Sequence, residues 1–172
     1  MNQPDEVAAI SSRGSATDSF GHTAPFLLSL RRYFLVIAPL NLVWEVAHMP
    51  LYTLWQTGTT EEIVFAAVHC TGGDILIAMS ALMLSLLIVG AGWPQGRTGV
   101  KRVVVMTMAL GVAYTVFSEW LNIVVREAWA YSELMPIVPM IDAGLSPLLQ
   151  WIVIPGLAFA WALRPFRRSH TR

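Results

Sequence analysis

Apolar residues occur in four long runs along the chain, at about residues 33–49, 63–90, 102–125 and 144–163. Each run is close to or above the length that crosses roughly 30 Å of hydrocarbon as a helix. Helices that follow one another across a membrane run in opposite directions, so consecutive helices are expected to pack antiparallel. The predicted fold class is therefore all-α, a polytopic membrane protein with an up-down bundle of four transmembrane helices.

The remaining segments differ clearly from these runs. Residues 1–24 are polar and small and show no periodicity, which predicts a flexible N-terminal tail. The membrane domain is expected over 25–166, and a basic C-terminal tail over 167–172. Pro39 and Pro50 predict a kink or an early end in the first helix.

The amino-acid composition is that of a membrane protein, and it argues against several other classes of protein. Hydrophobic residues make up 55% of the chain and charged residues 13%, outside the range of ordinary soluble domains. The net charge of zero gives no sign of a nucleic-acid partner. With one cysteine, Cys70, an internal disulfide is excluded, and with it the thiol-oxidising four-helix membrane enzymes.

Basic residues are distributed unevenly between the connections, which predicts the orientation. Ten of the eleven flank the start of the first run, the second connection or the end of the fourth run: Arg13, Arg31, Arg32, Arg97, Lys101, Arg102, Arg164, Arg167, Arg168 and Arg172. Since basic residues in short connections mark the cytoplasmic side, both termini are expected to be cytoplasmic. The expected location is a bacterial inner membrane.

Polar residues repeat at helical spacing near the external ends of the runs. Residues spaced three or four apart share one helix face. Two such stripes, on the first and third helices, are Asn41, Glu45, His48, Tyr52 and Thr115, Glu119, Asn122, Arg126. Ser146 and Gln150 align on the fourth helix, where Ser146 is the expected N-cap and Pro147 the first helical residue.

The second helix fits this pattern less well. His69 and Asp74 are separated by about 140° around an ideal helix. Both can face one cavity only if Gly72 and Gly73 distort the turn or the cavity is broad.

Burial of these ionisable groups requires an explanation. An ionised Asp or Glu at the bilayer centre costs roughly 2.5–3.5 kcal/mol on insertion scales. The groups must therefore be protonated, paired, metal-bound or hydrated. The structural alternative is that they bond helices together, at about 0.6 kcal/mol per contact.

The functional hypothesis is an outward-facing polar pocket for a small or lipid-soluble substrate. Expected catalytic residues are Glu45, His48, Glu119 and Asp74. Expected substrate-binding residues are Asn41, Tyr52, Asn122, Tyr131, Ser146, Gln150 and Trp151. Expected metal ligands are Glu45, His48, His69, Asp74 and Glu119.

Several chemistries suit this set. One divalent transition metal, Zn, Fe, Mn or Cu, is expected if Glu45 and His48 act as ligands from one helix face. Without metal, a carboxylate and a histidine act as general acid and base. Axial haem binding by His48 and His69 is less favoured, because the nearby acids suit a haem slot poorly. An accessory subunit and a cation or proton relay are the non-enzymatic alternatives, although the cytoplasmic halves offer a relay few polar groups.

The blocks "WEVAHMPLYTLW", "HCTGGDILIA", "SEWLN", "WAYSELMP" and "GLSPLLQW" resemble those of small four-span bacterial inner-membrane proteins of unassigned function. The resemblance covers about residues 40–155 and implies four spans without a reaction. The connection "REAWAYSELMPIVPM" is long and aromatic, and it predicts either a cover over the external mouth of the pocket or an interfacial belt.

Overall fold

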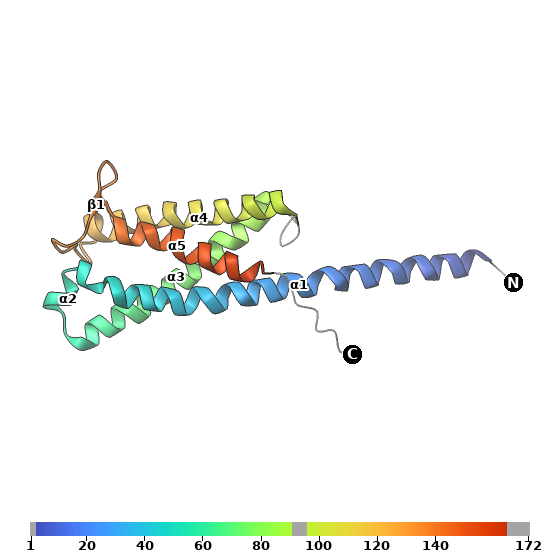
Figure 1. Ribbon diagram of the computed structural model, residues 1–172, viewed down its shortest axis with the longest axis horizontal. Coiled ribbons are helices and arrows are strands. Elements are labelled where there is room, and N and C mark those ends of the chain that lie inside the picture. The colour runs from blue at the N-terminus through green and yellow to red at the C-terminus, as the bar shows by residue number, and fades with distance from the viewer. Residues whose placement is uncertain (1–2, 91–95, 165–172) are drawn as a thin grey trace.

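The computed structural model describes the backbone of residues 3–90 and 96–164, and the side chains from Phe26 onward (Figure 1). Its elements are α1 Gln3–His48, the 3-10 helix η1 Met49–Leu51, α2 Leu54–Thr57, α3 Thr60–Val89, α4 Arg97–Glu119, the π-helical segment η2 Trp120–Val125, β1 Ile137–Val138, β2 Ala143–Gly144 and α5 Leu145–Ala162.

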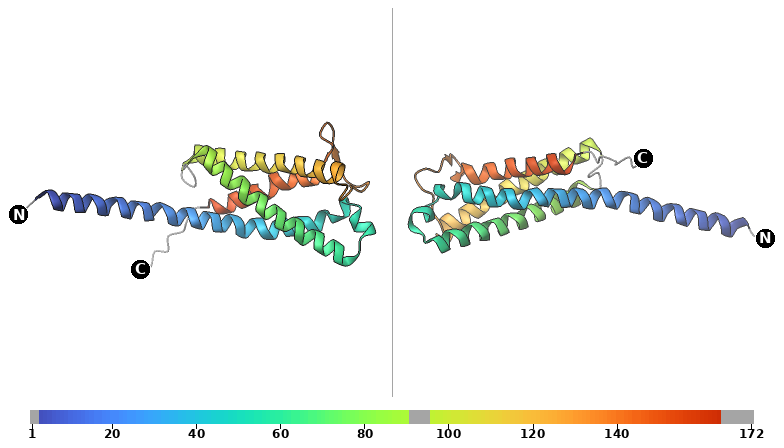
Figure 2. Two further views of the ribbon diagram at one scale, coloured as in Figure 1. Left: turned by 180° about the vertical axis from the view of Figure 1, so that it is seen from behind. Right: turned by 60° about the horizontal axis from the view of Figure 1, so that its bottom comes forward.

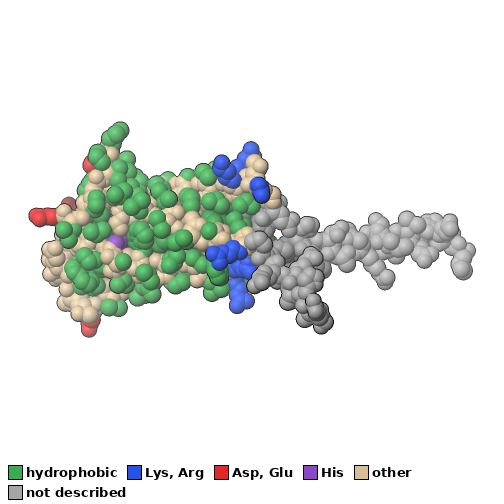
Figure 3. All heavy atoms as spheres, in the orientation of Figure 1, with side chains coloured by type: hydrophobic (Ala, Val, Ile, Leu, Met, Phe, Trp, Pro, Cys, Tyr) green, Lys and Arg blue, Asp and Glu red, His purple; other side chains and the backbone are tan. Residues whose placement is uncertain are grey.

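Four helical spans in the described part of the chain are long and apolar enough to cross a membrane: Phe26–Leu51, Thr60–Val89, Arg97–Val125 and Leu145–Ala162. They run side by side as a four-helix bundle (Figures 1 and 2). Hydrophobic side chains cover the flank of the bundle in Figure 3. The chain is thus an all-α, multi-pass membrane protein, and lipid is the environment that this surface fits.

The N-terminal segment differs from the prediction. Residues 3–24 belong to α1, whereas the sequence pattern predicted a flexible tail rather than a folded element there. Extending an existing helix by one residue needs no new nucleation, so a polar segment continues a helix that starts from an apolar one. Pro39 does not interrupt α1, which ends at His48, just before Pro50. The predicted tail at 167–172 lies outside the described residues.

Apolar side chains fill one half of the bundle. The buried cluster comprises Tyr33, Ile37, Ala78, Leu82, Val103, Trp151, Ile154, Ala158, Phe159 and Ala162. Within this half, the buried Thr107 hydroxyl donates to Ser85 Oγ at 3.1 Å and joins α4 to α3. Polar side chains are otherwise concentrated in the other half, which holds the candidate site.

Basic and acidic side chains lie at opposite ends of the bundle (Figure 3). The basic end, where α3 leads into α4, carries Arg31, Arg32, Arg97, Lys101, Arg102 and Arg164 among the described residues. The polar end, where η1 and the connection between η2 and α5 lie, carries the exposed acidic residues Glu61, Glu62, Glu127, Glu133 and Asp142.

Residues 126–144, here called the cover loop, are fastened to the polar end. Ser132 donates twice to the η1 turn, from its backbone nitrogen to Leu51 O at 2.9 Å and from Oγ to Pro50 O at 3.0 Å. Thr53 N donates to Ala130 O at 3.0 Å. The cover loop therefore lies over the ends of the helices, as one of the two sequence interpretations expected.

The start of α5 corrects the predicted helix cap. Gly144 is the N-cap, Leu145 is the first helical residue, and no side chain caps this end. The short β1-β2 hairpin and the bond from Leu145 N to Pro136 O at 2.8 Å hold the helix start, so Ser146 is not needed as a cap. Its hydroxyl is directed to His48 instead.

Gly111 provides the closest approach between α4 and α5. A Cβ atom built there would lie 2.2 Å from Cε3 and 2.7 Å from Cδ2 of Trp151. We expect Gly111→Ala to lower the free energy of unfolding by about 1–3 kcal/mol, because the buried indole cannot move without disturbing α5. Thermal unfolding in detergent measures this effect.

Gly156→Ala is the matched control for this prediction. Its new methyl group would meet only the flexible end of Met108, whose Cε lies at 3.3 Å. Both substitutions gain the same helix propensity, about 1 kcal/mol, so the difference between them isolates the clash. Equal melting temperatures for the two variants would contradict the tight contact at Gly111.

Candidate functional site

A cavity of about 410 Å³ lies in the polar half of the bundle. Its walls come from the end of α1, the first half of α3, the end of α4 with η2, the cover loop and the start of α5. The lining residues are Glu45, His48, Met49, Tyr52, Leu54, Ala66, His69, Cys70, Gly73, Asp74, Ile77, Tyr114, Thr115, Ser118, Glu119, Asn122, Arg126, Ala128, Trp129, Pro147, Gln150 and Trp151.

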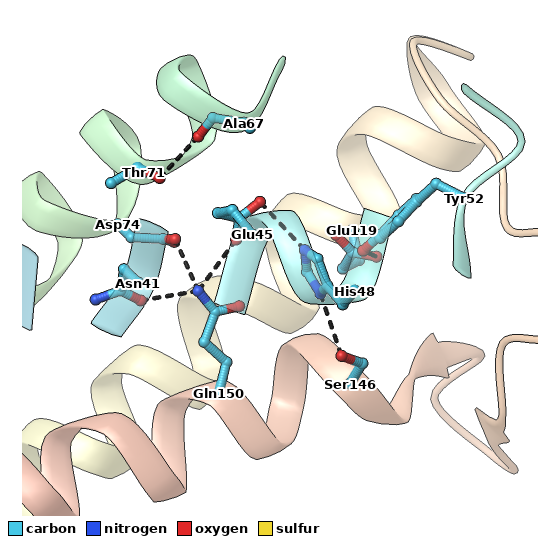
Figure 4. Close-up of polar contacts among 10 residues, drawn as sticks. All are labelled: Asn41, Glu45, His48, Tyr52, Ala67, Thr71, Asp74, Glu119, Ser146 and Gln150. Atoms are coloured by element: carbon cyan, nitrogen blue, oxygen red, sulfur yellow. Dashed lines mark hydrogen bonds and ion pairs between the residues drawn. The ribbon is translucent and has the colours of Figure 1, made fainter. Parts of the chain in front are cut away.

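His48 lies in the last turn of α1 and has a partner at each ring nitrogen (Figure 4). Its Nε2 is 3.1 Å from Glu45 Oε2, and its Nδ1 is 3.1 Å from Ser146 Oγ on α5. Glu45 and His48 are both buried. The i, i+3 spacing seen in the sequence places both on the helix face that meets α5.

Gln150 connects three of the spans through one atom (Figure 4). Its Nε2 lies 2.8 Å from Asn41 Oδ1, 3.1 Å from Glu45 Oε1 and 2.8 Å from Asp74 Oδ2. Asn41 and Glu45 come from α1 and Asp74 from α3, while Gln150 itself is only 3% exposed. The amide thus fixes two carboxyl groups at the same depth.

Glu119 forms a second centre on the α4 wall of the cavity. Its Oε2 accepts hydrogen bonds from the hydroxyls of Tyr52, at 3.4 Å, and Tyr131. The Tyr131 oxygen accepts in turn from Gly144 N at 2.8 Å. One carboxylate therefore connects α4 to the η1 turn and, through the cover loop, to the start of α5.

Burial raises the pKa of the Tyr52 phenol, and the neighbouring Glu119 raises it further. Burial also raises the pKa of Tyr131, as does its hydrogen bond to Glu119. Both phenols consequently keep their protons throughout the physiological range and remain donors to Glu119.

The π-helical segment η2 changes the end of the polar stripe on α4. Thr115, Glu119 and Asn122 are buried, whereas Arg126 is exposed beyond the widened turn. Asn122 Nδ2 donates to Ser118 O at 2.9 Å, and Arg126 Nη1 lies 3.5 Å from Asn122 Oδ1. A π turn inside an α-helix is often found at functional sites.

The structure does not assemble the five expected metal ligands into a single cluster. His69 is exposed and stacks on Phe65 with ring centroids 5.4 Å apart. Asp74 is engaged with Gln150, and Glu119 with two tyrosines. No group of three or more His, Cys, Asp or Glu side chains in the described residues is arranged to hold a metal ion. Metal binding stays a prediction.

The expected substrate-binding residues fall into two groups. Tyr52, Asn122, Gln150 and Trp151 line the cavity. Asn41, Tyr131 and Ser146 lie behind its wall and bond to residues that line it, namely Gln150, Glu119 and His48.

Other lining residues were not predicted from the sequence. Neither Cys70 nor Trp129 was among the expected site residues, yet both line the cavity. Ser118, which the polar stripe omitted, is bonded to Asn122. The position of Cys70 next to His69, and the four-residue spacing of Ser118 and Asn122, were the available signals.

No protein-family model matches this chain, and neither the curated proteins nor the solved structures contain a significant match. The resemblance to small four-span inner-membrane proteins therefore stays a prediction, and interpretation of the cavity depends on its own geometry.

The two phenols predict how stability depends on pH. Because the pKa of Tyr131 is higher in the folded chain than the ordinary value of about 10, the folded state binds its proton more tightly than the unfolded state. The contribution is fully present below about pH 10 and is lost as the pH rises through the folded pKa. We expect the melting temperature to fall less steeply above pH 10 for Tyr131→Phe than for the parent.

At pH 8 the same substitution removes a donor to a carboxylate and should cost roughly 1.5–3 kcal/mol. Tyr52→Phe supplies the comparison, since its hydroxyl approaches the same carboxylate oxygen. If the melting temperatures of the parent and of both variants fall with the same slope above pH 10, the idea that the fold keeps these tyrosines protonated is contradicted.

Proposed function

We propose that this protein catalyses proton transfer by general acid–base chemistry on a small lipid-soluble molecule bound in the cavity. The observation that supports this proposal is the presence of two separate titratable centres on the walls of one cavity. One is His48 paired with Glu45, and the other is Glu119 bonded to tyrosine hydroxyls. An acid and a base on a single substrate are the minimum that a proton-transfer reaction requires.

His48 is held in a defined orientation by the contacts at its two ring nitrogens. With Nε2–H donating to Glu45, Nδ1 accepts from the Ser146 hydroxyl. The series Ser146, His48, Glu45 has the contact order of a nucleophilic triad, but Ser146 is not among the residues that line the cavity. Ser146 therefore acts as a positioning residue for the imidazole rather than as a nucleophile.

The number of hydrogen-bond acceptors around Gln150 supports the presence of an additional proton in the site. Its amide nitrogen carries two hydrogens, yet three oxygen acceptors lie within 3.1 Å. A proton held by Asp74 or Glu45 supplies the missing hydrogen and keeps the pair of carboxyl groups from carrying two negative charges. Such a proton is available for delivery to a bound molecule from Glu45, which itself lines the cavity.

Glu119 is placed to exchange a proton directly with a bound molecule. It lines the cavity and is 7% exposed, with neutral phenols as its hydrogen-bond partners. Donors that point at a carboxylate stabilise its charged form, and a substrate that displaces one of them frees a carboxylate oxygen to accept a proton. Glu119 is thus the proposed base, with the His48 and Glu45 pair as the acid.

Metal binding is the alternative that the same residues leave open. A metal on His48 would have to replace either Glu45 or Ser146 at a ring nitrogen. Metal analysis of the purified protein tests this directly: stoichiometric metal in the parent, lost in both Glu45→Ala and His48→Ala, would favour a metal centre over acid–base chemistry by side chains alone.

For the orientation, we propose that the basic end faces the cytoplasm of a bacterium and the polar end faces outward across its inner membrane. The positive-inside rule supports this assignment. Among the Lys and Arg residues whose side chains are described, all except Arg126 lie at the end of the bundle where α3 leads into α4. Both termini would then be cytoplasmic, and the cavity would lie in the outer half of the membrane.

Labelling of single cysteines tests the orientation. In a Cys70→Ser background, Gln56→Cys places a thiol at the polar end and Thr98→Cys at the basic end, and both positions are exposed. We expect a membrane-impermeant maleimide to label only Gln56→Cys on intact cells and both variants after lysis. The opposite pattern would invert the topology.

Hydrogen exchange into lipids tests the proposed reaction. Protein in vesicles made from the membrane lipids of its source cells is incubated in D₂O, and the lipids are analysed by mass spectrometry for deuterium on carbon. We expect one lipid species to gain deuterium with the parent, and Glu119→Gln or His48→Gln to slow this exchange by about 100-fold or more.

Glu133→Gln is the control for this experiment, because it removes an exposed carboxylate at the same end of the bundle. Its exchange should equal that of the parent. If no lipid gains deuterium in the presence of the parent, or if Glu119→Gln exchanges at the parental rate, the acid–base proposal is wrong.

A further inference from the structure

The cavity has an open side as well as buried walls. Its α1 and α5 walls are buried, with Glu45 5%, Gln150 3% and Trp151 3% exposed. By contrast, Tyr114 on α4 is 48% exposed and His69 on α3 is exposed, although both line the cavity. The cavity therefore reaches the surface between α3 and α4.

This opening lies at the depth of the lipid chains. His69 is nine residues from the start of α3, and Tyr114 is eleven residues before the end of its span at Val125. At 1.5 Å per residue, these positions are roughly 14 and 17 Å along the helices from the polar end. An opening at that depth admits molecules from the bilayer rather than from water.

One of two adjacent glycines on α3 keeps that side of the opening free of a side chain. A Cβ atom built at Gly72 or at Gly73 meets no atom within 4 Å. Gly73 lines the cavity, whereas Gly72 is exposed and does not line it. The two residues point about 100° apart on the helix, so only Gly73 controls the width of the opening.

At the polar end, the cover loop forms part of the cavity wall, although Arg126 and Ala128 on this wall are exposed. Ala128 and Trp129 of the cover loop form part of the lining, and the loop is bonded to the η1 turn through Ser132 and to Glu119 through Tyr131. A molecule arriving from the aqueous side would have to pass this bonded loop, whereas a molecule entering between α3 and α4 would not.

One donor in the lining has no acceptor. Trp129 Nε1 is buried and has no hydrogen-bond partner among the described residues. A buried N–H without an acceptor is costly, and an oxygen atom of a ligand would satisfy it. Since Glu45, Asp74 and Glu119 also line the cavity, an anionic head group would be repelled.

Building on the proposed function, we infer that the substrate enters sideways from the bilayer between α3 and α4. We further infer that it is an amphipathic molecule with an apolar chain and an uncharged hydroxyl or carbonyl head group. The head group lies near Trp129 and Glu119, and the apolar chain passes Gly73 and extends to the lipid.

Photolabelling with a long-chain alcohol that carries a diazirine tests this inference in proteoliposomes. Labelled peptides are mapped by mass spectrometry, and labels are expected on the α3 and α4 segments that line the opening. We expect Gly73→Leu to reduce this labelling about tenfold, because the new side chain enters the opening. Gly72→Leu is the matched control and should label like the parent.

Ala66→Leu provides a second way to narrow the opening if Gly73→Leu does not fold, since Ala66 also lines the cavity on α3. Equal labelling of Gly73→Leu, Ala66→Leu and Gly72→Leu would overturn the lateral route. Labels confined to the cover loop would do so too, because they would indicate entry from water.

The head group is tested with two probes and one variant. Trp129→Phe keeps an aromatic ring but removes the N–H group. It should reduce labelling by the alcohol several-fold while leaving labelling by a diazirine alkane of the same length unchanged. Equal competition by unlabelled alcohol and alkane would contradict an oxygen-bearing head group.

These measurements are independent of catalysis. Glu119→Gln should abolish deuterium exchange yet retain labelling that is sensitive to Gly73→Leu. If Gly73→Leu reduces labelling and Gly72→Leu does not, while the parent shows no exchange, the lateral opening stands and the acid–base proposal falls. If exchange is present but Gly73→Leu and Ala66→Leu label like the parent, the acid–base proposal stands and the lateral opening falls.

Discussion

The side-chain amide of Gln150 is the interaction on which the polar half of this bundle depends. Without it, the side-chain oxygens of Asn41, Glu45 and Asp74 would lose the one nitrogen donor that all three share. Buried acceptors without donors are costly in any protein, and more so where lipid replaces water. One nitrogen on α5 therefore determines how closely α1 and α3 approach at this level and keeps Glu45 directed toward His48.

The same constraint explains why the bundle divides into two halves. Polar contacts are directional and require exact positions, whereas the apolar cluster around Phe159 and Leu82 requires only good packing. The polar contacts of the site gather in the half where the η1 turn and the cover loop supply additional backbone and hydroxyl groups. The cavity exists because these directional contacts hold the helices in place without filling the space between them.

Much of this arrangement follows from residue spacing. The four spans follow from apolar length, and the shared depth of Glu45, His48 and Glu119 follows from their position near the helix ends and their spacing of three or four. Residue spacing could not predict which hydrogen-bond partner each polar side chain would have. Ser146 appeared to be a helix cap because a Pro follows it, yet the β1-β2 hairpin already fixes that helix start. The buried N–H of Trp129 depends on how the cover loop folds, which no local pattern specifies.

Trp151 belongs both to the lining of the cavity and to the apolar cluster beneath it, where its ring lies against Gly111. It is therefore the floor that separates the two halves. An indole ring backed by hydrocarbon therefore closes the inner end of the cavity. The ionisable groups of the site are separated from the basic end of the bundle by this apolar layer, which would act as insulation between the two membrane surfaces.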